Sequence, residues 1–282
     1  MINKDNLPEG VSVVTDASGN ANQQGVISNG LTVEANSDTD IETGVSMSIK
    51  DGTVLRDKAG NELTGQLTSI LKYYDPSEIL AMKSLPFDLA EDETGLPIIM
   101  AGAGQLNITD QEGRSLSVAE KAANFKNNDG PVSFTFKLKT GAVNPVNGMP
   151  YKSGDTIGLW LLDHELEPME STTSDIIELD TGGLGVIYST HQIPHVVYTG
   201  NSYADNKCTE TIRFTLNDYK GRFAGNAFMS GFLKRVVKDN NDRSITMFDI
   251  PNQELEYEFE LPSGQIINRT LNLCEYNDLI CN

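Results

Sequence analysis

The strongest constraint on the fold is the stretch 44–76, in which apolar and polar residues alternate on both sides of one tight turn. The alternation places Val45, Met47 and Ile49 on the same face of an extended segment. The turn at 57–61 contains Asp, Gly and Asn, and a second alternating segment follows it. Period-two alternation around a turn that contains Gly is typical of a β-hairpin. The stretch therefore predicts two antiparallel strands.

The same type of turn recurs along the chain with the pattern Asp-x-x-Gly, beginning at Asp16, Asp57, Asp110 and Asp218. An Asp side chain can accept hydrogen bonds from the following backbone N–H groups, and Gly can take the positive φ that such turns require. We interpret the recurrence as backbone chemistry rather than as a binding motif. Short alternating segments between such turns predict β-sandwich architecture.

We predict an all-β protein with two β-sandwich domains of immunoglobulin-like or ZU5-like type and one or two short helices in loops. The helices are expected at 76–82 and 118–123, and strands include 98–101, 104–109, 132–139, 157–163 and 227–237. The polar segment 200–206 is the predicted boundary. The expected parts are a flexible N-terminal segment at 1–25, a larger sandwich at 26–199 and a smaller one at 207–282.

The net charge of −19 opposes binding to nucleic acid, because phosphate contacts require clustered Lys and Arg. Solubility explains an acidic surface, and calcium binding is the alternative, since Ca²⁺ prefers several carboxylate and carbonyl oxygens. No loop has EF-hand spacing. The candidate calcium ligands are Asp88, Glu91, Asp92 and Glu93, with a second acidic group at Asp38, Asp40 and Glu42. No other cofactor is predicted.

The three cysteines, Cys208, Cys274 and Cys281, all lie in the last quarter of the chain, and none forms a C-x-x-C pair. A zinc ribbon or redox motif is therefore not indicated. Cys208 can pair with Cys274 or with Cys281 in an oxidising compartment, and free buried thiols are the third alternative.

The apolar runs are far shorter than the roughly 18 residues of a membrane helix. The N-terminus has no apolar segment typical of a signal peptide, so either the protein is cytosolic or such a segment was removed from an exported protein. We favour the second alternative.

The sequence does not indicate catalysis. His191 and His195 are four residues apart, which is about 13 Å along a strand and too far to share a metal. Neither a G-x-S-x-G nucleophile elbow nor a phosphate-binding loop occurs. With 40 acidic residues, any choice of a carboxylate pair for glycoside hydrolysis is arbitrary.

Aromatic residues offer one candidate binding site. Trp160 with Tyr73, Tyr74 and Tyr151 would form a platform on which a sugar ring stacks. Trp160 lies between Leu159 and Leu161, however, and a place in the core is the competing interpretation of that Trp.

Several motifs resemble surface proteins of Bacteroidetes-type bacteria, whose module is similar to the extracellular β-sandwiches of cartilage intermediate layer protein and the ZU5-like group. They are G-T-V-L-x-D-x-x-G-N-x-L-T-G-x-L-T with Y-Y-D-P at 52–76, Leu85-Pro86-Phe87, the strand and turn at 105–114, G-D-x-I-x-L-W-x-x-D at 154–163, and G-x-x-x-x-T-H at 185–191. The resemblance covers about 25–198 and implies a fold and an envelope location, without an active site. Residues 207–282 resemble the small sandwich repeats often appended to such proteins.

The chain departs from this family where Gln192-Ile193-Pro194-His195 replaces the usual Ser and aromatic residue. Some ZU5-like proteins cleave themselves at a His-Phe-Ser step, which is missing here, so self-cleavage is not inferred. We expect a non-catalytic, secreted or lipoprotein-type surface protein that binds or adheres to a protein or polysaccharide. The alternatives are a structural spacer in a surface assembly and an accessory domain of a carbohydrate-processing system.

Overall fold

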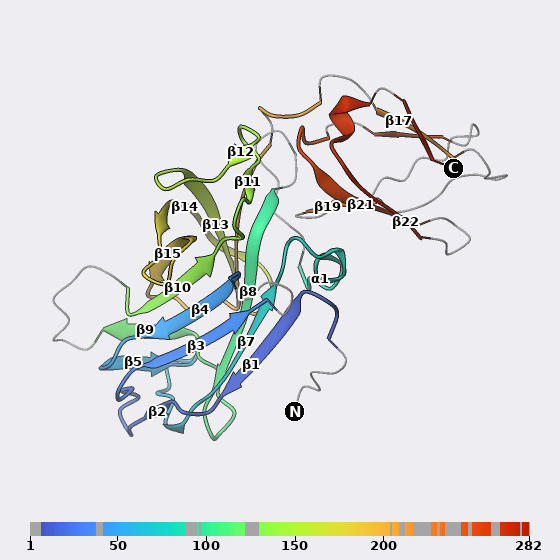
Figure 1. Cartoon of the computed structure of the whole chain (residues 1–282). Helices are drawn as coiled ribbons and strands as arrows, with labels where there is room; N and C mark the ends of the chain where they lie inside the picture. Colours follow the sequence, from blue (N-terminus) through green and yellow to red (C-terminus); the bar gives the residue numbers. More distant parts are fainter. Residues whose placement is uncertain are drawn as a thin grey trace. The chain divides into compact units, whose positions relative to one another are not determined.

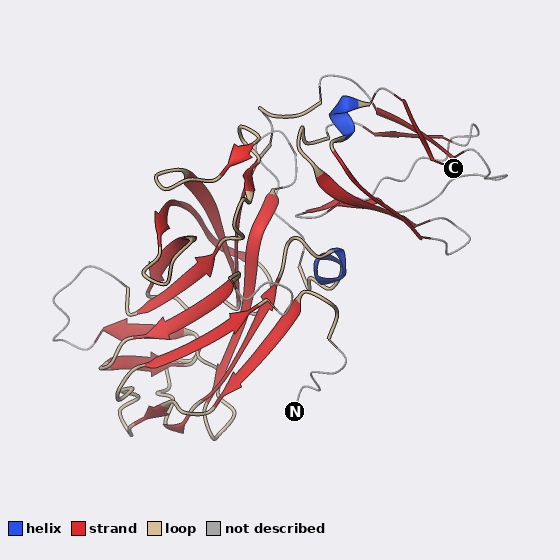
Figure 2. Cartoon of the chain, viewed as in Figure 1, coloured by secondary structure: helices blue, strands red, loops and turns tan. Residues whose placement is uncertain are grey.

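The computed structural model describes residues 7–37, 42–87, 95, 98–121, 130–203, 205–208, 212–216, 227–229, 232–234, 244–247, 250–260, 266–276 and 278–281. Strands dominate, and the one α-helix is α1 (Ile79–Lys83) within the described residues (Figure 2). The prediction of an all-β protein with a short helix after residue 76 is therefore confirmed.

Residue contacts divide the chain into two compact units. The first comprises 1–75, 101–140 and 152–199, and the second comprises 76–100, 141–151 and 200–282. This division differs from a split near residue 200, because two segments from the N-terminal part of the chain join the C-terminal unit. Local composition cannot report such long-range contacts.

The first unit is organised around a ten-stranded sheet that curls until its first and last strands, β1 and β3, come into contact (Figure 1). Curling of this kind follows from the right-handed twist of strands and fits a β-sandwich. The strands in spatial order are β1 (Val11–Asp16), β7 (Thr68–Tyr74), β8 (Ile99–Thr109), β16 (Val196–Asn201), β13 (Thr156–Leu162), β14 (Pro168–Glu178), β15 (Leu184–Thr190), β10 (Val132–Lys137), β4 (Gly44–Ile49) and β3 (Leu31–Asn36). Two short pairs complete the unit, namely β2 (Asn20–Ala21) with β6 (Gly65–Gln66) and β5 (Thr53–Arg56) with β9 (Val118–Lys121).

The N-terminal strand β1 lies within the segment predicted to be flexible. It pairs antiparallel with β7, from Val11 opposite Tyr74 to Asp16 opposite Ser69. Val11 and Val13 are buried, so this part of the chain belongs to the sheet and contributes to its core.

The predicted strands at 98–101 and 104–109 are one continuous strand, β8. Gly102 and Gly104 do not break it, because both are needed for close packing. A Cβ atom at Gly104 would lie 3.1 Å from Cγ1 of Val45, and one at Gly102 would lie 3.2 Å from Cδ1 of Phe136. These glycines let the two halves of the curled sheet approach each other.

A helix was predicted at 118–123. The described residues of this segment, 118–121, instead form the strand β9. β9 pairs with β5 from Val118 opposite Arg56 to Lys121 opposite Thr53. The pairing and an Arg56–Glu120 ion pair of 3.3 Å outweigh the weak local preference for a helix.

The second unit contains smaller sheets and a disulfide bond. Its strands are β11 (Val143–Asn144), β12 (Met149–Pro150), β17 (Ile212–Leu216), β18 (Ala227–Met229), β19 (Phe232–Lys234), β20 (Ser244–Met247), β21 (Leu255–Glu260), β22 (Ile266–Leu271) and β23 (Asp278–Cys281). Within the single strand predicted at 227–237, the described residues form the antiparallel pair β18–β19 instead.

Cys208 is bonded to Cys274, with a Cα–Cα distance of 5.1 Å, which resolves the three alternatives for Cys208. Within the same unit, Lys83 of α1 forms an ion pair with Glu258 of β21, whose side chain is 8% exposed. These two contacts tie segments that are far apart in the sequence.

Candidate binding surface

The outer face of four adjacent strands in the first unit is an ordered array of small hydroxyl side chains. The strands are β3, β4, β10 and β15, and their pairing is antiparallel and free of bulges throughout (Figure 1). One cross-strand row consists of Thr32, Ser48, Ser133 and Ser189. The next consists of Glu34, Ser46, Thr135 and Ile187, and a third of Asn36, Gly44, Lys137 and Gly185. We call these three rows the hydroxyl face.

The position of the hydroxyl face follows from the alternation of each strand. The residues between its members, such as Val33, Met47 and Phe134, are buried in the core. Because successive strand residues point to opposite sides, the Ser and Thr residues must point outward. Thr32 and Ser189 are exposed, and Ser48 and Ser133 are half-buried.

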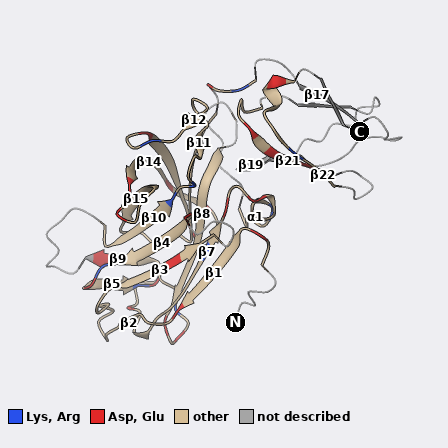
Figure 3. Ribbon diagram, viewed as in Figure 1, with Lys and Arg blue, Asp and Glu red and all other residues tan. Residues whose placement is uncertain are grey.

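Charge is nearly absent from this surface. β4 and β15 contain no charged residue, and β3 and β10 contain one each (Figure 3). These two, Glu34 and Lys137, form an ion pair, and the hydrogen bond from Lys137 lowers the pKa of Glu34. The hydroxyl face is therefore locally neutral on a chain of net charge −19.

Two exposed isoleucines, Ile177 of β14 and Ile187 of β15, lie at one side of the hydroxyl face. Ile177 and Ile187 are 38% and 43% exposed. Gly185 has no side chain, and the position its Cβ would take lies 2.5 Å from Cδ1 of Leu179. Leu179 therefore covers the sheet beside Ile177.

Four loops of the first unit share one geometry, in which an Asp or Asn side chain caps a five-residue turn. Oδ1 of the first residue accepts backbone N–H groups two and four residues later, and the fourth residue has a positive φ. The loops, which we call Asx loops, are 22–26, 57–61, 110–114 and 163–167. The turns predicted at Asp57 and Asp110 are confirmed, and their shared backbone chemistry agrees with the interpretation from the sequence.

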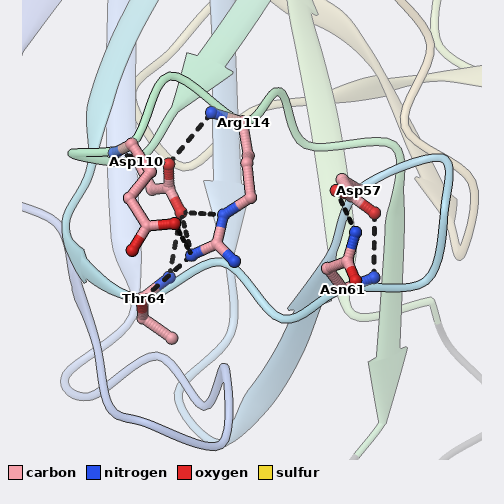
Figure 4. A network of polar contacts seen from close by, with 6 residues as sticks. Asp57, Asn61, Thr64, Asp110 and Arg114 are labelled. Carbon is pink, nitrogen blue, oxygen red and sulfur yellow. Dashed lines mark hydrogen bonds and ion pairs between the residues drawn. The ribbon is translucent and has the colours of Figure 1, made fainter.

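Two Asx loops lie side by side around Arg114 (Figure 4). Its Nε donates to Oδ2 of Asp110 at 2.8 Å, and its Nη2 donates to Oγ1 of Thr64 at 3.1 Å. Burial raises the pKa of Asp110, but the hydrogen bonds from Arg114, Thr64 and Glu112 outweigh it and leave the pKa below its usual value. In the neighbouring loop, the hydrogen bonds from Asn61 lower the pKa of Asp57. The carboxylate of Asp57 is satisfied by its own turn, and that of Asp110 by its own turn and by the backbone N–H of Thr64.

A second polar network in the first unit is half-buried and centres on His195. Its Nδ1 lies 2.9 Å from the carbonyl oxygen of Leu106, and its Nε2 lies 2.8 Å from Nε2 of Gln105. Tyr74 donates to Oε1 of Gln105 at 2.9 Å. The ring of His164 lies 4.6 Å from the ring of His195, centroid to centroid. His195 therefore has His164, rather than His191, as its close neighbour.

The predicted aromatic platform is not formed. Tyr73, Tyr74 and Tyr151 are 1%, 3% and 8% exposed, so none of them offers a ring face to a sugar. Trp160 is half-buried and stacks on Tyr198 with ring centroids 5.4 Å apart. The alternating pattern gives two faces for each strand but does not say which face is buried.

The predicted calcium ligands Asp88, Glu91, Asp92 and Glu93 lie outside the described residues, as do Asp38 and Asp40. Glu42 is exposed, and its Oε2 accepts a hydrogen bond from Oγ1 of Thr140 at 3.2 Å. In the described part of the chain, no three His, Cys, Asp or Glu side chains gather where they could hold a metal ion. The prediction of a calcium site at 88–93 stays a prediction.

The described helices include none that is long and apolar enough to cross a membrane. No protein-family model matches the sequence, and neither a curated protein nor a solved structure matches it. The hydroxyl face was not identified from the sequence, although its signal is present there as Ser or Thr at alternate positions of two strands, β4 with Ser46 and Ser48 and β10 with Ser133 and Thr135.

Proposed function

We propose that this chain is a non-catalytic binding module of a bacterial cell envelope and that the hydroxyl face is its binding surface. The observation that supports this proposal most strongly is the in-register array of six hydroxyl side chains on the hydroxyl face, whose only two charges neutralise each other. Outer faces of antiparallel sheets are usually polar. On a chain with 40 acidic and 21 basic residues, however, such a face would be expected to carry several unpaired charges.

The chemistry of this surface fits a neutral polysaccharide. Hydroxyl groups both donate and accept hydrogen bonds, as sugar hydroxyls do. Neighbouring strands are about 4.8 Å apart and alternate residues about 7 Å apart, so the array repeats regularly in two directions. A polymer of repeating sugars can meet such an array at several points, and Ile177 and Ile187 can contact its C–H surfaces. An anionic polysaccharide would be repelled by the net charge of −19.

An exported location is part of the same proposal. The resemblance to surface proteins with ZU5-like or immunoglobulin-like modules supports it, and so does the Cys208–Cys274 disulfide, because such bonds persist mainly in oxidising compartments. A secreted or lipid-anchored form fits equally.

A structural spacer is the second candidate. It is favoured by the Asx loops, whose carboxylates and amide oxygens are occupied by the backbone of their own turns. Loops of this kind provide rigidity rather than free ligand groups.

Co-sedimentation of the whole chain with insoluble polysaccharides distinguishes the two. We expect retention on at least one neutral polysaccharide and none on anionic ones at the same ionic strength. Retention on none of a broad neutral panel would contradict the proposal and favour the spacer.

A further inference from the structure

The hydrogen bonds around His195 can run in only one direction. The carbonyl oxygen of Leu106 can only accept, so Nδ1 of His195 must carry the proton. Nε2 of the neutral ring is then an acceptor, and it receives the amide N–H of Gln105. The amide oxygen of Gln105 in turn receives the hydroxyl of Tyr74. The network therefore holds His195 neutral and in one tautomer.

Protonation of His195 would conflict with this arrangement. A proton on Nε2 would face the NH₂ group of Gln105, so two donors would meet at 2.8 Å. Relief requires the amide of Gln105 to turn over, which would leave Tyr74 to accept instead of donate. Tyr74 is 3% exposed, and burial raises its pKa to about 12, so its hydroxyl keeps its proton and would need a new acceptor.

His195 is also linked directly to the Asx loop 163–167 at the tip of the β13–β14 hairpin. Its backbone N–H donates to the carbonyl of Leu162 at 2.9 Å, and its ring lies against His164 of that loop. On its outer side, this loop is held by the 3.0 Å ion pair of Lys58 with Glu165. A change in the protonation of His195 therefore acts directly on the contacts of the exposed loop 163–167.

The charged and titratable groups facing His195 come from two elements. His164 and Asp163 belong to the 163–167 loop, Tyr74 and Lys72 belong to β7, and Lys72 lies directly across from Gln105 in β8. Burial lowers the pKa of His195, His164 and Lys72 lower it further, and the carbonyl of Leu106 and Asp163 oppose the change. Two protonated imidazoles at this distance would repel each other.

We propose that His195 is the sensor of an acid-operated latch, in which protonation of Nε2 turns over the Gln105 amide and releases the 163–167 loop from the His195 ring. The latch is closed at neutral pH and opens as the pH falls below the ordinary range of histidine titration. Because an unfolded chain binds this proton more readily than the folded one, the stability of the first unit falls in the same direction.

Nitrogen NMR of the whole chain tests this proposal, because the protein has only three histidines and variants His164→Asn and His191→Asn assign them. We expect His195 to carry its proton on Nδ1 at pH 7.5 and to titrate below the ordinary range of a histidine side chain. The backbone amides of 163–167 should shift with the midpoint of His195. A proton on Nε2 at pH 7.5, or amides that follow only His164, would overturn the proposal.

A charge-matched pair of variants gives a second test. Glu in Gln105→Glu can accept from a protonated Nε2, so the midpoint of His195 and the loop shift should both move to higher pH by at least one unit. Gln23→Glu adds the same charge at an exposed position of another loop and should leave both unchanged. If the two variants had the same His195 midpoint and the same loop shift, the proposal would also be overturned. If Gln105→Glu does not fold, the tautomer of His195 measured in the wild-type protein tests the proposal instead.

Discussion

Leu166 occupies, at φ +64°, the position in its Asx loop that Gly113 occupies at φ +78° in the loop 110–114. The two loops have the same capping pattern, from Asp163 and Asp110 respectively, so the strain belongs to Leu166 rather than to the turn. A left-handed backbone costs an L-residue other than Gly about 1–2 kcal/mol. The hairpin pairing and the cap of Asp163 offset that cost.

Replacement of Leu166 by Gly should therefore stabilise the protein. We expect the free energy of unfolding, measured with urea, to rise by about 1 kcal/mol, because the relief of strain exceeds the entropy that Gly adds to the unfolded chain. Gly113→Ala is the matched reverse variant, since no atom lies within 4 Å of the position its Cβ would take. It should lose about 1 kcal/mol, and a loss in both variants would refute this explanation of the loop.

The hydrogen bonds accepted by the carboxylate of Asp110 should be the main polar interactions that hold its own loop against Thr64. Its side chain is fully buried and accepts from Arg114 and two backbone N–H groups of its loop. Asp110→Asn removes the charge and should cost about 2 kcal/mol at pH 7, which is typical of hydrogen bonds to charged groups.

The same variant should change the acid dependence of stability. Because the folded pKa of Asp110 is lowered, its contribution is present above the unfolded value of about 3.9 and is lost as the pH falls through the folded value. Asp110→Asn should therefore flatten the stability curve below about pH 4. Parallel curves for wild type and variant would contradict the assignment.

Close packing at Gly104 can be tested by a pair of substitutions. The Cβ of Gly104→Ala would lie 3.1 Å from Cγ1 of Val45, and overpacking of this kind costs about 1–3 kcal/mol. Val45→Ala removes the methyl groups involved, so the double variant should be more stable than the sum of the two single losses predicts. If the loss of stability in the double variant equals the sum of the two single losses, the contact with Val45 is not the reason for a glycine at position 104.

The features that were predicted correctly from the sequence are those whose interactions join residues only a few positions apart. The turn at Asp57 is one example, because its side chain and Gly60 meet their partners inside the turn. Strand β9 was missed because its partner β5 lies more than 60 residues away, and nothing near Val118 reports it. Tyr73 was placed in a binding site because alternation alone does not distinguish the inner face from the outer. The polar network around His195 could not have been inferred from the sequence, since its partners Gln105, Leu106 and His164 come from distant segments.

The most direct test of the proposed function is titration calorimetry with a soluble oligosaccharide of whichever neutral polysaccharide retains the protein. The double variant Ser48→Ala/Ser133→Ala removes the two central hydroxyls of the first row and keeps the strands intact. Two lost hydrogen bonds of about 1 kcal/mol each should weaken binding at least tenfold. Thr270→Ala, at an exposed position of β22 in the second unit, is the control and should bind as wild type. Equal affinity of the double variant and the wild type would contradict the assignment of the hydroxyl face as the binding surface.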